Sequence, residues 1–384
     1  MINWKFIFRL LLLIIPLVAF ILFVNIRVDG GFVIHNRSNE IAKILVSGKN
    51  AGVKFIPSNW GGLQIAVVDE QLNLNDPHAK DILVFGTSRS SELHSEMFPS
   101  NTFYNCAIPN GNIKDYIALY GLYKKHNLLP KYVIISIDPW TFHARKSVTV
   151  NKEIHYVSDL NTPLRVNSNL ADDYAKGLKY LGFNDPENQE ANDKLTIDNM
   201  IELFNPNYFQ LNLKSLTDKI VIETKNDSVN SYFIIRSDGS YTLTQQSQVD
   251  SGAVTDKTNR FVNVQKSDFF VASDTNSIQW LYFKKLLISL KMNGVIPIVY
   301  ISPVNPIVFD HLADQAKVLL EDKIDLFCKD NMILRIGSFN PHLFGYHSSS
   351  NLFMDPYHPV KTVVEQLFYF RKNELKAIGI NTAQ

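Results

Sequence analysis

The feature that most constrains the fold is an alternation of short apolar runs with helical patterns. Apolar runs of strand length lie at residues 81–86, 131–138, 295–301 and 332–336. Apolar residues at helical spacing separate or follow them, at residues 113–126, 276–293, 311–328 and 360–378. A chain in which buried strands alternate with helices forms a parallel sheet that is covered on both faces. The sequence therefore predicts an α/β fold of three layers.

The alternation is interrupted between residues 145 and 270, a region richer in Asn, Asp, Ser and Lys. Residues 232–243 within it predict a β-hairpin that turns at Asp238-Gly239. We interpret the region as an inserted α+β segment that covers or flanks a functional site. In parallel sheets such sites form where the strands reach their carboxyl ends, so these ends are where we look for chemistry.

The N-terminus carries a long apolar run. Residues 6–26 are apolar except for Arg9 and Asn25, and a helix of about 20 such residues spans a bilayer. The alternative is a cleaved signal peptide, whose apolar region is about 7–15 residues long and precedes small residues at the cleavage site. The sequence after the run shows no such pattern. We therefore expect a single-pass transmembrane signal anchor, with residues 1–5 as a cytoplasmic tip.

Residues 28–80 carry turn signals, Asp29-Gly30-Gly31 and Gly61-Gly62, and no strong periodicity. We interpret them as a juxtamembrane segment that joins the anchor to a domain beginning near residue 81. Lys5 and Arg9 precede most of the apolar run, which favours a cytoplasmic N-terminus. Everything beyond the anchor is then expected to be extracytoplasmic.

Composition narrows the classes of partner and cofactor. The 384 residues include 38 basic and 37 acidic side chains, for a formal net charge of +1, whereas a nucleic-acid partner would normally require a basic excess. Two cysteines, Cys106 and Cys328, are too few for a disulfide framework or a cysteine-based zinc site; they form either one bridge or two free thiols. The histidines show no metal-ligand spacing and no Gly-rich phosphate loop is present, so we expect no metal and no cofactor.

Ser88 stands directly after the first predicted strand, in the sequence Gly86-Thr87-Ser88-Arg89-Ser90. On a tight strand-to-helix turn its hydroxyl can point into the crevice. Its own N–H, near a helix N-terminus, can donate to a developing oxyanion. The alternative is that Ser88 is merely part of a capping turn, and Ser90 or Ser91 is expected to cap the short helix that follows.

Asp355 and His358 lie in a loop just before the last predicted helix, beside Pro356 and Pro359. His358 can deprotonate a serine, and Asp355 can orient the imidazole and stabilise its charged form. The alternative is a turn with incidental polar side chains. Because the two motifs occur in the order and structural context that serine catalysis requires, we predict Ser88 as nucleophile, with Asp355 and His358 as its partners.

Four motifs of the sequence resemble those of one superfamily: Gly-Thr-Ser-Arg-Ser at 86–90, Phe-Tyr-Asn at 103–105, Ile-Asp-Pro-Trp at 137–140 and Asp-x-x-His-Pro at 355–359. The sequence resembles the SGNH/GDSL hydrolase superfamily. More closely, it resembles the membrane-anchored bacterial envelope branch, with relatives of the D-alanine transfer protein and of the alginate O-acetylation proteins. The resemblance covers roughly 81–140 and 275–380. It implies a flavodoxin-like SGNH domain over 81–384, with the insertion at about 145–270, in the bacterial cell membrane.

The resemblance implies further site residues, with departures from the usual pattern. The first block of the superfamily is usually Gly-Asp-Ser, and here Thr87 replaces the aspartate. The second block supplies a backbone donor from a glycine, for which Asn110-Gly111 is the candidate. The third block supplies an asparagine to the oxyanion hole, where this sequence has Asp138. An ionised Asp138 would repel an oxyanion, so we expect Asp138 to bind a substrate hydroxyl or to pair with Arg89. If Arg89 is not paired with a carboxylate in this way, we expect it to bind an anionic or acyl-donor group.

The residues and the resemblance together imply serine-dependent O-acyl transfer, with acetyl as the expected group, on a cell-surface polysaccharide or teichoic-acid-like polymer. The expected partners are that glycan, the membrane through residues 6–26, and a multi-pass membrane O-acyltransferase. An esterase that removes acyl groups from such a polymer is the alternative at the same site. A non-catalytic glycan-binding or scaffold protein of the envelope is the other alternative, because the third-block asparagine is missing at Asp138.

Overall fold

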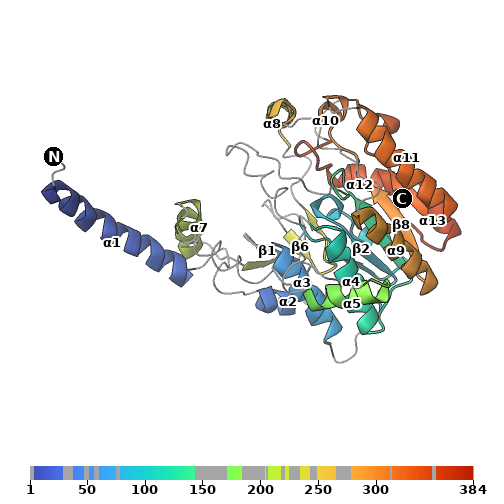
Figure 1. The fold of residues 1–384 in the computed structure, drawn as a ribbon, viewed down its shortest axis with the longest axis horizontal. Helices are drawn as coiled ribbons and strands as arrows, with labels where there is room; N and C mark the ends of the chain where they lie inside the picture. Colours follow the sequence, from blue (N-terminus) through green and yellow to red (C-terminus); the bar gives the residue numbers. More distant parts are fainter. Residues whose placement is uncertain are drawn as a thin grey trace.

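The computed structural model describes residues 4–28, 38–46, 52–55, 60–74, 78–109, 111–142, 171–183, 204, 206–217, 221–224, 234–242, 249–264, 278–311, 314–347 and 352–383. Within these residues the chain forms one parallel and one antiparallel sheet, with helices packed around them (Figure 1). The parallel sheet carries the candidate site. The antiparallel sheet joins residues 28–80, referred to below as the N-terminal segment, to the insertion.

The parallel sheet has five strands, in the order β3 (Phe103–Asn105), β2 (Ile82–Phe85), β4 (Tyr132–Ile137), β8 (Ile296–Ile301) and β9 (Leu334–Gly337). Numbered along the chain, this is the order 2-1-3-4-5 of doubly wound, flavodoxin-like sheets. The predicted α/β fold with a parallel sheet is therefore confirmed. The sequence patterns do not predict the edge strand β3, because a strand this short shows no clear periodicity.

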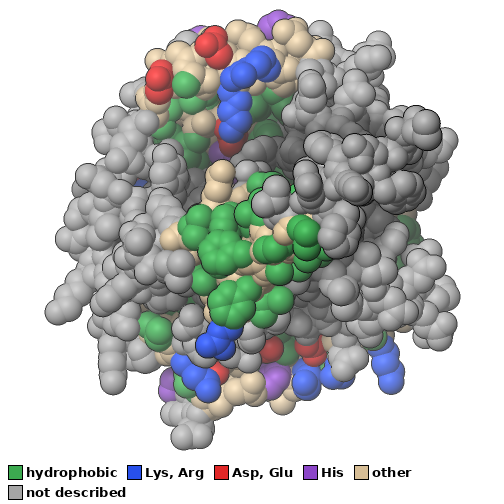
Figure 2. All heavy atoms as spheres, turned by 90° about the vertical axis from the view of Figure 1, so that its left-hand side faces the viewer, with side chains coloured by type: hydrophobic (Ala, Val, Ile, Leu, Met, Phe, Trp, Pro, Cys, Tyr) green, Lys and Arg blue, Asp and Glu red, His purple; other side chains and the backbone are tan. Residues whose placement is uncertain are grey.

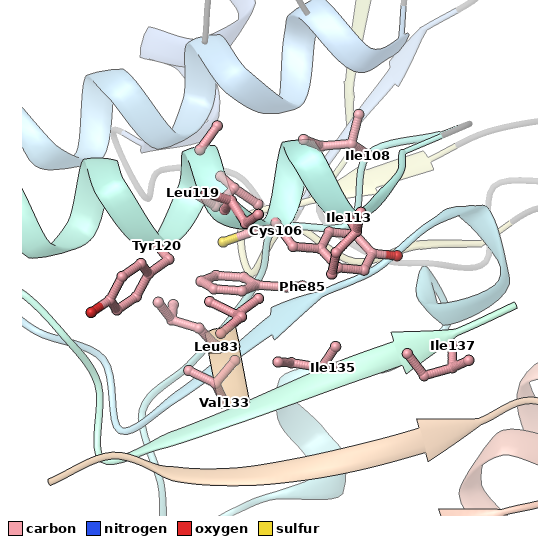
Figure 3. Close-up of a cluster of buried hydrophobic side chains, with 14 of the residues drawn as sticks. Leu83, Phe85, Cys106, Ile108, Ile113, Leu119, Tyr120, Val133, Ile135 and Ile137 are labelled. Atoms are coloured by element: carbon pink, nitrogen blue, oxygen red, sulfur yellow. The ribbon is translucent and has the colours of Figure 1, made fainter. Parts of the chain in front are cut away.

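Successive side chains of a strand point to opposite faces of a sheet. Because the strands here are apolar on both faces, helices cover both. Leu83 and Phe85 belong to one buried cluster, and Ile82 and Val84 to another. Figure 3 shows the first cluster, in which side chains of β2 and β4 point toward α4. The first face is covered by α4 (Ile113–Lys125), α9 (Ile278–Met292) and α11 (Asp314–Asp330), and the second by α12 (Lys361–Phe370) and α13 (Lys372–Ala377).

Helix boundaries follow local signals in the sequence. A capping box starts α4: the Asn112 side chain accepts a backbone hydrogen bond, and Asp115 accepts one from the Asn112 N–H at 2.9 Å. Gly294, with a φ of 78°, follows α9, in the left-handed conformation that glycine adopts at helix ends. The helix predicted to begin at residue 311 is offset, because α10 (Pro306–His311) ends there and α11 follows.

The segment at 28–80 differs from the prediction. It contains α2 (Ser38–Val46), β1 (Gly52–Phe55) and α3 (Trp60–Leu72), and the predicted turn at Gly61-Gly62 is wrong because both glycines lie inside α3. Glycine lowers helix propensity, but the buried side chains that follow stabilise this helix against the core. Ile41 and Ile65, each 1% exposed, belong to the same buried cluster as β2 and β4. The segment is therefore packed onto the parallel-sheet domain.

The first helix, α1 (Trp4–Val28), covers the apolar N-terminal run and extends away from the sheets (Figure 1). Several of its large apolar side chains are exposed, and Figure 2 shows hydrophobic side chains gathered at the centre of the face from which α1 projects. Near its end, the buried Asn25 side chain accepts a hydrogen bond of 2.9 Å from Asn212 of α7 (Pro206–Thr217). Across the described residues, no helix is long and apolar enough to cross a membrane. The anchor at 6–26 stays a prediction.

The described parts of the insertion are helical and β-stranded, as predicted. They comprise α5 (Ala171–Tyr180), α7, β5 (Val221–Thr224), β6 (Ile234–Arg236), β7 (Tyr241–Thr242) and α8 (Ser251–Val264). The hairpin predicted at Asp238-Gly239 is confirmed, since β6 and β7 pair antiparallel around it. The antiparallel sheet has the order β5-β1-β6-β7, so a strand of the N-terminal segment lies between two strands of the insertion.

The two cysteines are free and buried. Burial raises the pKa of each thiol to about 12, and Cys106 Sγ also lies 3.4 Å from the Tyr123 hydroxyl. Cys106 packs among the side chains drawn in Figure 3. Of the two states left open by the sequence, the structure therefore has two free thiols.

Candidate active site

The turn after β2 holds Ser88 at the carboxyl end of the sheet. Ser88 is the first residue of a 3₁₀ turn that ends at Ser90, and the Thr87 side chain caps it by accepting a 3.2 Å hydrogen bond from the Arg89 N–H. The prediction that Ser90 or Ser91 caps the following helix is wrong; their hydroxyls donate to the carbonyls of Thr87 and Ser88 at 2.9 and 2.7 Å.

Gly86 makes this tight turn possible. A Cβ at this position would lie 2.0 Å from Ser90 Oγ and 2.8 Å from Ser136 Cβ. Real Cβ atoms do not approach other heavy atoms so closely, so any other residue here would displace the turn that carries Ser88.

The loop before α12 holds Asp355 and His358. It is closed by a β-bridge between Phe353 and Pro359 and by a 2.9 Å hydrogen bond from the Met354 N–H to the His358 carbonyl. Asp355 Oδ1 accepts the N–H groups of Tyr357 and His358 at 2.9 and 2.8 Å. An aspartate that binds the backbone two and three residues ahead fixes its own side chain, so the carboxylate is held in a single orientation.

The structure brings the three predicted residues into one relay. Ser88 Oγ lies 2.8 Å from His358 Nε2, and His358 Nδ1 lies 2.7 Å from Asp355 Oδ2. An ionised carboxylate only accepts hydrogen bonds, so Nδ1 carries the proton and Nε2 of the neutral ring accepts the serine proton. This is the nucleophile–base–orienter geometry of serine catalysis.

The Asp355 carboxyl is tuned for this position. Burial alone would raise its pKa, but the charge of His358, the hydrogen bond to it and the Tyr357 N–H outweigh burial and lower the pKa to about 2. Lys257 of α8 lowers it further. Asp355 is therefore ionised at any pH above about 4 and keeps the imidazole in the tautomer described above.

Arg89 and Asp138 form an ion pair beneath the relay. Asp138 follows β4, and its Oδ1 accepts a 3.2 Å hydrogen bond from Arg89 Nη1 while both side chains are fully buried. Its Oδ2 accepts the Thr87 hydroxyl at 2.6 Å. Of the two roles expected for each residue, the structure shows mutual pairing.

The donors of an oxyanion hole are only partly present. Among the described residues, no backbone acceptor is bonded to the Ser88 N–H at the start of its 3₁₀ turn, so it can donate to an oxyanion. The Gly111 N–H donates to the Ile108 carbonyl at 2.7 Å, so it is already paired within its own turn, and its service to an oxyanion stays a prediction. Asn110, the other half of that predicted pair, lies outside the described residues.

Several residues of the site were missed or underrated by sequence reasoning. The carbonyls of Ser302 and Pro303, after β8, accept Arg89 Nη2 at 2.6 and 2.9 Å. Trp140 and Tyr357 pack edge to face with ring centroids 5.6 Å apart. The Tyr357 ring also lies 4.7 Å from that of His358. Backbone acceptors carry no sequence signal, but Trp140 stands in the Asp-Pro-Trp motif at the end of β4.

The insertion flanks the site, as expected. The Tyr241 N–H of β7 donates to the carbonyl of Ser91 at 3.0 Å, and the Asn105 N–H donates to the carbonyl of Asp238 at 2.8 Å. From α8, the Phe261 ring lies 6.0 Å from that of Tyr357. The hairpin therefore packs against Ser91 and Asn105, close to the turn that carries Ser88, and α8 lies against the loop that carries His358.

We expect Gly239→Ala to detach the hairpin from this segment. Gly239 has a φ of 77°, and a Cβ would lie 2.2 Å from the Asn105 carbonyl oxygen and 2.7 Å from the Tyr104 ring. The predicted loss of unfolding free energy is about 2 kcal/mol or more, measured by chemical denaturation. Gly182→Ala is the control: its φ is 80° but its Cβ would meet nothing within 4 Å. Equal losses in both variants would show that the hairpin contact contributes nothing.

Within the described residues, no group of three or more His, Cys, Asp or Glu side chains is placed to hold a metal ion. Comparison of the chain with protein-family models and with curated proteins found no match. The candidate site therefore rests on its own geometry.

Proposed function

We propose that the chain catalyses serine-dependent O-acyl transfer, with acetyl as the group transferred. The observation that carries the proposal is the relay in which Ser88 Oγ, His358 and Asp355 are joined by contacts of 2.8 and 2.7 Å. The position of the relay also supports it, because Ser88 lies at the carboxyl end of β2, where ligands bind in doubly wound sheets.

The reaction follows from the relay. Ser88 Oγ attacks the acyl carbon of an ester, its proton moves to His358 Nε2, and the carbonyl oxygen becomes an oxyanion beside the Ser88 N–H. Collapse of this intermediate breaks the ester C–O bond, and the proton on Nε2 passes to the leaving oxygen. An acceptor hydroxyl then gives its proton to Nε2 and attacks the acyl carbon of the acyl-serine. As the bond between that carbon and Ser88 Oγ breaks, the proton passes from Nε2 to Oγ and restores Ser88. The acyl group ends on a sugar in transfer and on water in hydrolysis.

The acceptor we propose is a cell-surface polysaccharide or a teichoic-acid-like polymer outside the bacterial membrane. This part rests on the apolar run at 6–26 and on the motif resemblance. An accompanying multi-pass membrane O-acyltransferase would supply the acyl donor. Esterase activity on the same polymer is the alternative that uses the same residues in the same roles.

A non-catalytic glycan-binding or scaffold role is the second candidate. The state of two positions favours it: the Gly111 N–H is bonded to Ile108, and Asp138, which stands where the superfamily has an oxyanion-binding asparagine, is bonded to Arg89. Loss of each oxyanion donor typically lowers a rate by about 10²–10³, so the loss of both positions weighs toward the non-catalytic role.

The test uses the intact chain in detergent. We expect it to release the alcohol of an activated aryl acetate and to be labelled by a fluorophosphonate at Ser88, with Ser88→Ala as the unlabelled control. An added acyl-acceptor oligosaccharide should gain acyl groups; loss of acyl groups from an acylated one would favour the esterase. Absence of both turnover and labelling would exclude the two enzymatic functions and leave the binding role.

A further inference from the structure

We propose that Arg89 and Asp138 are positioning residues, which hold the turn carrying Ser88 and the loop carrying His358 in the register that lets the two side chains meet. The proposal deepens the proposed function and rests on it. It concerns the same site, and it assigns both residues a role other than contact with substrate.

The buried guanidinium of Arg89 joins three separate segments of the chain. Besides Nη1 to Asp138, Nε donates to the carbonyl of Tyr357 at 2.9 Å, and Nη2 donates to the carbonyls of Ser302 and Pro303. These acceptors belong to the end of β4, the end of β8 and the histidine loop. Arg89 is 1% exposed, so its donors face protein groups.

One of these bonds matters most for catalysis. Among the described residues, two hydrogen bonds join the turn at 86–91 to the loop at 353–359: Ser88 with His358, and Arg89 with Tyr357. Once Ser88 is acylated, its hydroxyl proton is gone and the first bond is lost. The bond from Arg89 then remains to hold His358 next to the acyl-serine for the second half of the reaction.

Asp138 fixes the turn from the other side. Its two oxygens bind the residues on either side of the nucleophile, Thr87 at 2.6 Å and Arg89 at 3.2 Å. Its own N–H donates to the Thr141 hydroxyl at 2.8 Å, which holds the end of β4. Both residues that flank Ser88 in the sequence are thus held by hydrogen bonds to Asp138.

Stability alone is a poor reason for such a pair. Burying an ion pair costs desolvation that its attraction only partly offsets, and well-packed apolar residues often replace such pairs without loss of stability. The planar fork of arginine does something an apolar residue cannot, because it fixes several acceptors at set angles. Lysine, a single point charge, cannot serve the same four acceptors.

The pair also sets the charge around the histidine. The charged and titratable groups that interact with Arg89 are Asp138, Tyr300 of β8 and Asp355, and Asp355 interacts in turn with His358 and with Lys257 of α8. Arg89 and Asp138 carry opposite charges and lie 3.2 Å apart, so as a pair they add no net charge beside the relay. Removing one partner leaves the charge of the other uncompensated.

The test compares the acidic limb of the pH dependence of kcat/KM, which reports protonation of the general base. Arg89→Met leaves an extra carboxylate and should move the limb up by about one pH unit, whereas Asp138→Asn leaves an extra cation and should move it down by a similar amount. Arg89→Lys keeps the positive charge, so the acidic limb should stay at the same pH. The kcat should still fall about 10²-fold, because Ser88 and His358 are no longer held in the correct positions.

Arg335→Met is the matched control. Arg335 forms ion pairs with Glu321 and Asp325 on α11, away from the relay. It should lower stability and leave both kcat and the limb unchanged. The positioning role would be overturned if the acidic limb moved in the same direction in Arg89→Met and Asp138→Asn. It would also be overturned if Asp138→Asn, like Arg335→Met, left kcat and the acidic limb unchanged.

A second readout does not depend on turnover. The ring of His358, assigned by comparison with His358→Gln, can be titrated by NMR in the intact chain and in the isosteric Asp138→Asn, which is the variant best able to fold. A downward shift with no turnover in wild type would leave the positioning role intact and contradict the proposed function. Turnover in wild type, together with an unshifted titration of His358 in Asp138→Asn, would leave the proposed function intact and contradict the positioning role.

Discussion

Ser88→Ala and His358→Ala are each expected to lower kcat for an aryl acetate by about 10⁴ or more, and the double variant is expected to lose no more than either alone. The reason is that the 2.8 Å contact makes the two side chains one functional unit. Without the imidazole the hydroxyl keeps its proton, and without the hydroxyl the imidazole has nothing to activate. The measurement is a steady-state assay of all three variants beside wild type.

The controls make the same changes at residues outside the relay. Ser91→Ala removes a hydroxyl of the same turn that donates to the Ser88 carbonyl at 2.7 Å. His342→Ala removes an imidazole that lies 2.8 Å from Asp310 on the surface. Both should retain most activity. Additive losses at Ser88 and His358 would mean that the two residues act in separate steps and would contradict the relay.

Asp355→Asn is expected to lower kcat by about 10⁴ while the fold is kept, since the side chains have the same shape. Asp355 Oδ1 accepts two backbone N–H groups, so the carbonyl oxygen of an asparagine must take that place. Its NH₂ group then points at His358 Nδ1 and forces Nδ1 to accept. The ring proton moves to Nε2, where it blocks transfer from Ser88.

Asp310→Asn is the control for this change, because Asp310 also contacts a histidine but lies on the surface. It should leave kcat unchanged. In Asp355→Asn, a ¹⁵N spectrum of the imidazole should show the proton on Nε2 in place of Nδ1. Full activity, or an unchanged tautomer, would contradict the role of Asp355 as the residue that orients the ring.

The relay could be predicted from the sequence because its parts are encoded locally. Ser88 follows a strand pattern at once, and Asp355 and His358 share one short loop. The topology of a parallel sheet then brings strand ends and the final loop to one edge. The pairing of Arg89 with Asp138 was one of two expectations for each residue, and sequence alone does not choose between them.

Other features depend on contacts that no local pattern encodes. Whether the Gly111 N–H is free is decided by the Ile108 carbonyl three residues before it in a turn, and not by the glycine itself. Gly61-Gly62 is read as a turn by composition, yet the packing of Ile65 and its neighbours keeps it helical. Tertiary packing thus overrides propensity in one case, and backbone geometry overrides residue type in the other.

The position of β1 has a consequence for how the molecule can be divided. Gly52 pairs with Thr224 on one side and with Arg236 on the other, so the insertion completes its sheet with a strand borrowed from more than 160 residues earlier in the chain. A fragment that began at residue 81 would leave two unpaired strand edges facing each other across a gap, and such edges promote aggregation. The smallest autonomous unit therefore starts before Gly52, and β1 is an integral part of the folded domain.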